Sequence, residues 1–112
     1  MKKVSLTSNE FLSLYNGCVL GDNFSVVLKG LEKYFGYPVL TIDAMGKERI
    51  FRQEINKSRP DLVTVMNKLG KFVRNRNIDI DTQTNEYVKN FETLYGKNTV
   101  ELVQYKTEEL SM

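Results

Sequence analysis

The chain has 112 residues, of which 41% are hydrophobic and 27% charged, and this composition is typical of one small globular domain. It contains no histidine and a single cysteine, which excludes a Ser-His-Asp or Cys-His catalytic group, a structural zinc site and an internal disulfide. The longest apolar runs are three residues, so we expect a cytoplasmic protein that does not enter a membrane.

The clearest local signal is a helix start near the N-terminal end. Thr7 and Glu10 have the spacing of a capping box, in which each side chain accepts a hydrogen bond from the backbone amide of the other residue. Leu6 and Phe11 flank the box at the spacing of a hydrophobic staple. Apolar residues then recur at helical spacing as far as Val19, which predicts the first helix.

Further along the chain, a helix and a β-hairpin are expected. Apolar side chains recur at helical spacing over residues 24–35, and Gly36 can adopt the left-handed conformation that ends a helix. A β-branched run from Val39 to Ile42, a turn that ends in glycine, and a mixed run from Lys47 to Phe51 follow. This order is typical of a β-hairpin.

The second half of the chain predicts two helices and a strand. Ser58 and Asp61 have capping-box spacing before an apolar stripe that continues to Val73. Another helix is expected over residues 84–95, which are followed by Gly96. Residues 99–106 then alternate as a strand does, and residues 107–112 are expected to form a frayed tail.

Together these elements predict an α+β fold in a single domain over residues 1–112. About four helices would pack on a small, mainly antiparallel sheet. The sheet would contain Val39–Ile42, Lys47–Phe51 and Val100–Tyr105, with Val4–Leu6 as a further edge strand.

No group of residues has the pattern of a catalytic or cofactor site. Cys18 lies on an apolar stripe with no histidine to activate it, which favours a core residue over a nucleophile. Asp79 and Asp81 could form a metal-binding or acid–base pair, but flanking the start of the next helix is the favoured interpretation. No glycine-rich phosphate loop occurs. We therefore predict no catalytic residue, no metal site and no cofactor.

Charge is unevenly distributed along the sequence. Residues 1–43 have no net charge, residues 44–77 carry nine basic and three acidic residues, and residues 78–112 carry three basic and seven acidic residues. The basic middle could contact nucleic acid. Alternatively, it could neutralise the acidic end, within one chain or between two copies, and this second interpretation is favoured.

Two segments resemble a known group of proteins. The opening KVSLTSNEFLSLYN, at residues 3–16, is similar to the start of small uncharacterised early proteins of bacteriophages that infect low-GC Gram-positive bacteria. Tyr87–Phe91 followed by Val100–Lys106 matches the helix and strand with which those proteins tend to end. The resemblance covers about a third of the chain. It implies an origin in a mobile element and brings no catalytic residues with it.

These observations predict a non-enzymatic, protein-binding accessory protein. Its partner would be a bacterial host or defence protein, such as a CRISPR-type nuclease, that it inhibits or redirects. The alternatives are a nucleic-acid-binding accessory that uses residues 47–76, with weak or indirect contact, and a structural or assembly subunit. A second copy of the chain, in a homodimer, is the alternative partner. Six tyrosines and the basic segment suggest the contact residues. The candidate partner-binding residues are Tyr37, Arg49, Arg52, Lys68, Lys71, Arg74 and Tyr105.

Overall fold

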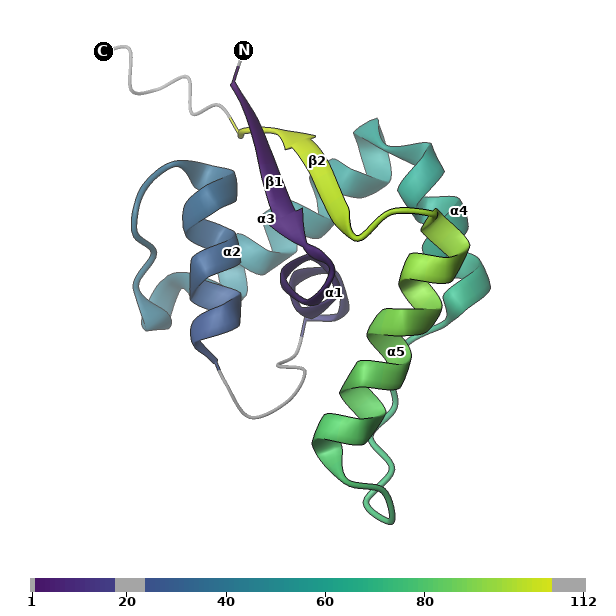
Figure 1. The fold of residues 1–112 in the computed structure, drawn as a ribbon. Helices are drawn as coiled ribbons and strands as arrows, with labels where there is room; N and C mark the ends of the chain where they lie inside the picture. Colours follow the sequence, from purple (N-terminus) through teal and green to yellow (C-terminus); the bar gives the residue numbers. More distant parts are fainter. Residues whose placement is uncertain (1, 18–23, 106–112) are drawn as a thin grey trace, which may run out of the picture.

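Five α-helices and a two-stranded sheet form the described part of the chain, residues 2–17 and 24–105 of a computed structural model (Figure 1). The predicted α+β class is confirmed, with five helices rather than about four. The elements are, in order, β1 (Lys3–Thr7), α1 (Ser8–Asn16), α2 (Ser25–Phe35), the 3-10 turn η1 (Thr41–Asp43), α3 (Ala44–Ser58), α4 (Pro60–Leu69), α5 (Ile80–Tyr95) and β2 (Thr99–Val103).

The sheet joins the first and last elements of the chain. β1 pairs with β2 in antiparallel register, from Lys3 opposite Val103 to Thr7 opposite Thr99. Side chains alternate across a strand, and here Leu6 and its partner Val100 face the core with no exposed surface. The strands predicted at the two ends of the chain are therefore confirmed, although β2 ends at Val103 and not at the predicted Tyr105.

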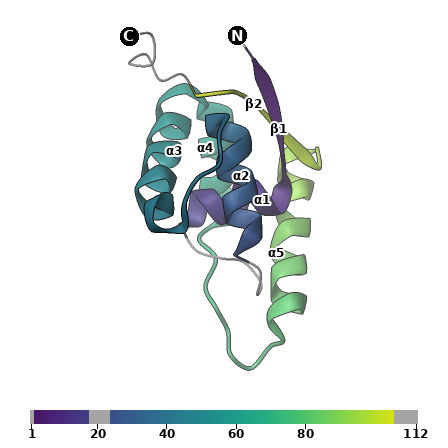
Figure 2. The same ribbon diagram turned by 90° about the vertical axis from the view of Figure 1, so that its left-hand side faces the viewer.

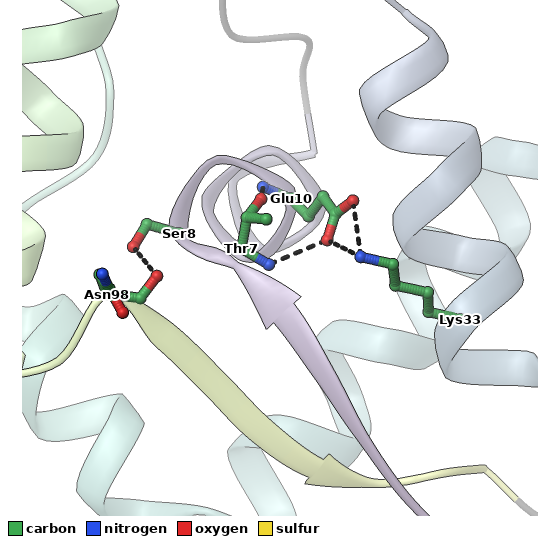
Figure 3. Close-up of polar contacts among 5 residues, drawn as sticks. All are labelled: Thr7, Ser8, Glu10, Lys33 and Asn98. Atoms are coloured by element: carbon green, nitrogen blue, oxygen red, sulfur yellow. Dashed lines mark hydrogen bonds and ion pairs between the residues drawn. The ribbon is translucent and has the colours of Figure 1, made fainter.

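The predicted capping box at the start of α1 is confirmed (Figure 3). The backbone amide of Thr7 donates to Glu10 Oε1 at 2.9 Å, and the amide of Glu10 donates to Thr7 Oγ1 at 3.1 Å. The same Glu10 carboxylate accepts from Lys33 Nζ of α2 at 2.9 Å, while Ser8 Oγ donates to the carbonyl of Asn98 at 3.1 Å. One helix start thus links α1 to β1, α2 and the segment before β2.

α1 lies at the centre of the molecule, with α2, α3 and α5 around it (Figures 1 and 2). Its Phe11 is fully buried, and the ring lies 5.9 Å from the ring of Phe51 on α3 and 5.6 Å from that of Phe91 on α5. α1 ends at Asn16, before the predicted Val19, because Gly17 adopts a left-handed conformation with φ of 71°.

The predicted β-hairpin is wrong. Neither Val39–Ile42 nor Lys47–Phe51 forms a strand; the first leads into η1 and the second belongs to the 15-residue helix α3. The buried side chains of α3 are spaced three or four residues apart, as one face of a helix requires. They are Ala44, Glu48, Phe51 and Ile55. Burial of this face against the core outweighs the local β-propensity of the preceding run.

The predicted start and end of the third helix also need correction. Ser58 is the last residue of α3 and its hydroxyl donates to the Glu54 carbonyl, so it does not cap α4, which begins at Pro60. α4 ends at Leu69, because Gly70 has a φ of 85° and ψ of 170°. The predicted apolar stripe continued to Val73, but the residues after Leu69 lie in the loop that follows α4.

The remaining helix predictions are confirmed, with a shifted start for α5. α2 ends at Gly36 as predicted, and α5 ends at Gly96. α5 begins at Ile80, four residues before the predicted start, because the Asp79 carboxylate accepts from the Thr82 amide at 3.1 Å. Asp79 therefore caps the start of α5, in agreement with the interpretation favoured from the sequence. Cys18 and the tail at residues 107–112 lie outside the described residues.

Candidate functional site

Exposed apolar side chains gather between α2 and α3. Leu40, Ile42 and Met45, which we call the apolar ridge, are 66%, 86% and 73% exposed. Three such residues fall within six positions here, whereas the other large exposed apolar side chains of the described ranges are one pair in the loop before α5, Val73 and Ile78, and two isolated residues, Leu94 and Val103. Single exposed apolar residues are ordinary on a protein surface, but a cluster of them is typical of an interaction site.

Met45 of the ridge is exposed because of how α3 packs. Ala44 and Glu48 begin the buried face of α3, so Met45 and Arg49 share a different face of the helix, one turn apart. Arg49 is exposed. The apolar ridge is therefore followed on α3 by an exposed guanidinium group, and Met and Arg are both enriched in protein interfaces.

Tyr37 is fixed at the other margin of the apolar ridge. Its ring is half-buried and lies 6.2 Å from the ring of Phe35, and its hydroxyl accepts from Lys47 Nζ at 2.7 Å. The same ammonium group lies 4.9 Å from the ring centroid of Phe35. These contacts hold the start of the segment between α2 and α3 against both helices, which fixes the position of the ridge.

Two of the other candidate residues take part in internal packing. Arg52 is half-buried, and its Nη1 donates to the Leu14 carbonyl at 3.3 Å, at the C-terminal end of α1. Tyr105 packs its ring 5.1 Å from that of Phe35, and its amide donates to the Tyr34 carbonyl at 2.9 Å. Both residues hold elements together.

The three remaining candidates belong to α4 and the loop after it. Lys68 and Lys71 are exposed. Arg74 donates from Nη1 to the Ile78 carbonyl at 2.9 Å and to Gln83 Oε1 at 3.1 Å, and so it fixes the loop before α5. In Figure 1 this region lies on the opposite side of the molecule from the segment between α2 and α3. The structure thus brings Tyr37 and Arg49 to the apolar ridge, and the other five candidates elsewhere.

The expected neutralisation of the basic middle by the acidic end is not seen as ion pairs within the described ranges. The ion pairs found there join Lys33 to Glu10, Lys57 to Glu54 and Arg59 to Asp61. The contact that Arg59 makes with the acidic segment goes to the backbone carbonyl of Glu101, at 2.7 Å.

Sequence reasoning missed all three residues of the apolar ridge. Leu40 and Ile42 were assigned to a strand whose alternate side chains would be buried, and Met45 to a turn. The spacing of Ala44, Glu48, Phe51 and Ile55 is the signal that could have identified α3 and exposed the error.

Among residues 2–17 and 24–105, no cluster of three or more His, Cys, Asp or Glu side chains could hold a metal ion. In the same ranges, no helix is long and apolar enough to cross a membrane. The chain matches no protein-family model, no curated protein and no solved structure.

Proposed function

We propose that the protein acts by stoichiometric binding to another protein through the apolar ridge, with Tyr37 and Arg49 at its margins. The observation that carries this proposal is the exposure of Leu40, Ile42 and Met45 on a well-anchored segment. Burial of such side chains contributes about 1.5–3 kcal/mol each before the costs of association, which is enough to make them interface anchors.

The resemblance to bacteriophage early proteins suggests which class of partner to test. We propose a bacterial host or defence protein, such as a CRISPR-type nuclease, that is bound and inhibited or redirected in the host cytoplasm without any reaction being catalysed. A surface of exposed apolar residues with one flanking arginine suits the obstruction of a protein surface. Mimicry of DNA would require an acidic chain, whereas this chain carries a net charge of +2.

A pair of matched variants tests the role of the apolar ridge. Met45→Asp places a charge on the ridge, and Val73→Asp places one on the loop before α5 at a residue with the same 73% exposure. Both proteins should keep the melting temperature of the parent. We expect the tagged parent and V73D to retain the same bacterial partner at equimolar ratio, and M45D to lose it at least tenfold.

Two results would contradict the proposal. One is equal retention of the partner by M45D and the parent. The other is sub-micromolar binding of the parent to generic DNA at physiological salt, with an affinity that falls steeply as salt increases, which would favour the nucleic-acid alternative. Light scattering at low and high salt separates the homodimer alternative, because a dimer would persist without any added partner.

A further inference from the structure

A groove of about 660 Å³ runs between β2 and the C-terminal half of α3, away from the apolar ridge. Tyr34 and Ile55 are almost fully buried beneath it, while Val103 of β2 is 46% exposed on its edge. Two acidic residues, Glu54 of α3 and Glu101 of β2, are among those that line it. The groove is large enough for several side chains of a ligand.

One residue of β2 presents unused backbone groups to this groove. The amide of Gln104 donates to the Lys2 carbonyl, so the backbone of the neighbouring Val103 points away from β1. On this outer edge, the Glu101 carbonyl accepts from Arg59 Nη1 and the Tyr105 amide donates to α2. Between these two occupied positions, the N–H and C=O of Val103 have no partner among the described residues.

A second unpartnered group lies next to that edge. Tyr34 is 4% exposed, and its hydroxyl has no hydrogen-bond partner in the described ranges. Burial, with smaller contributions from the nearby Glu54 and Tyr105, raises the pKa of Tyr34 to about 12. The hydroxyl is therefore neutral at physiological pH, beside a carboxylate and a second tyrosine whose ring lies 6.0 Å away. Aromatic rings and carboxylates together are the groups that bind ammonium and guanidinium ions.

The charge around the groove also favours a cation. Arg59 is already neutralised, because it forms two 2.9 Å hydrogen bonds to the Asp61 carboxylate. Glu54 has only a long 3.8 Å contact with Lys57, and Glu101 has no ion pair among the described residues. Lys3, which also lines the groove, supplies one opposing positive charge.

We propose that this groove binds an extended segment of a partner protein, whose backbone pairs with Val103 and whose lysine or arginine side chain enters between Tyr34 and Glu54. The alternation of side chains along a strand determines where each ligand side chain would lie. A ligand residue opposite Val103 has its side chain on the outer face of the sheet, and the next ligand residue points inward, beside Leu102 and toward α3. This mode of recognition adds a short strand to a sheet edge and takes its specificity from alternate side chains.

The test uses blocked, fluorescently labelled pentapeptides and does not depend on the apolar ridge. The probe is threonine-valine-lysine-valine-threonine, and the comparison peptide has glutamate at the centre. We expect the lysine peptide to bind at least tenfold more tightly, and to shift the amide signals of Val103 and Tyr34 in NMR spectra. M45D, which alters the ridge, should bind the lysine peptide as the parent does.

Two pairs of variants separate the charge from the strand edge. Glu54→Gln should weaken binding of the lysine peptide about tenfold, while Glu86→Gln, at an exposed glutamate of α5, should not change it. Val103→Pro removes the outward amide and leaves the pairing with β1 intact, so it should abolish binding of the peptide. Thr99→Pro alters the same edge beyond the groove and should retain binding.

Three outcomes would overturn the proposal. The first is equal affinity for the lysine and glutamate peptides, and the second is unchanged binding in E54Q. The third is occupation of the edge by this chain itself. It would appear as a dimer whose interface includes Val103, or as tenfold tighter binding of both peptides when residues 106–112 are removed.

Discussion

The capping box at Thr7 allows the sharpest prediction about stability. Thr7→Ala removes the hydroxyl that accepts from the Glu10 amide at 3.1 Å, and leaves the reciprocal 2.9 Å bond from the Thr7 amide to Glu10 in place. Loss of one N-cap costs about 0.5–2 kcal/mol, and with the reciprocal bond retained we expect about 1 kcal/mol. An unfolding entropy of about 2.1 cal/mol/K per residue gives about 0.24 kcal/mol/K for a chain of this length, so Tm should fall by about 4 °C.

Two variants control for effects other than the cap. Thr7→Ser keeps the hydroxyl, so its Tm should remain within about 1 °C of the parent's. Thr99→Ala removes the side chain that pairs with Thr7 across the sheet, and so measures the contribution of the strand alone. Calorimetry and urea unfolding of the four proteins provide the data. If T7S is destabilised as much as T7A, or if T99A accounts for the whole loss, the hydroxyl does not act as a cap and the reasoning fails.

Three further predictions concern buried or paired polar groups. Burial raises the pKa of Glu48 above its ordinary 4.5, and Arg52 opposes this only in part. Glu48→Gln should therefore be more stable than the parent at pH 7 and equally stable below pH 4, where the Glu48 carboxyl is protonated. Urea midpoints at both pH values check this. The Thr84 hydroxyl oxygen is buried without a hydrogen-bond partner among the described residues, so Thr84→Val should raise the free energy of unfolding by about 1 kcal/mol, and a lower urea midpoint would contradict this. The hydrogen bond from Arg59 holds the pKa of Asp61 below its ordinary 3.8. The ionised carboxylate therefore stabilises the fold above pH 3.8, and this stabilisation is lost as the pH falls. Asp61→Asn should show a smaller decrease in Tm between pH 4 and pH 2 than the parent.

Local determinants explain which parts of the fold could be predicted. The capping box depends on Thr7 and Glu10, three positions apart, and the helix ends at Gly36 and Gly96 depend on one residue each. The hairpin prediction failed because a β-branched run of four residues, ending at Ile42, was given more weight than the helical spacing of the residues that follow. Burial of one face of α3 against the core determined the structure of residues 44–58.

The candidate sites depend on contacts that no local pattern contains. Met45 of the apolar ridge is exposed because α3 turns another face to the core. Leu40 and Ile42 are exposed because their segment forms η1, which buries no residue, and not the predicted strand. The groove needs β2 to pair with β1, which brings Val103 and Tyr34 together across about 70 positions of sequence. Of the candidates chosen from residue type alone, Arg52 and Arg74 serve the fold.

The pairing of the first strand with the last determines how the molecule responds to mechanical force. Lys3 lies opposite Val103 at the same end of the sheet, and the strands run in opposite directions. Tension applied between the two ends of the chain therefore acts across the hydrogen bonds and breaks them in succession, beginning with the bond from the Gln104 amide to the Lys2 carbonyl, whereas a shearing geometry would load all of them together. Force applied to both ends together would therefore meet little resistance at this sheet, because only one or two hydrogen bonds carry the load at any moment.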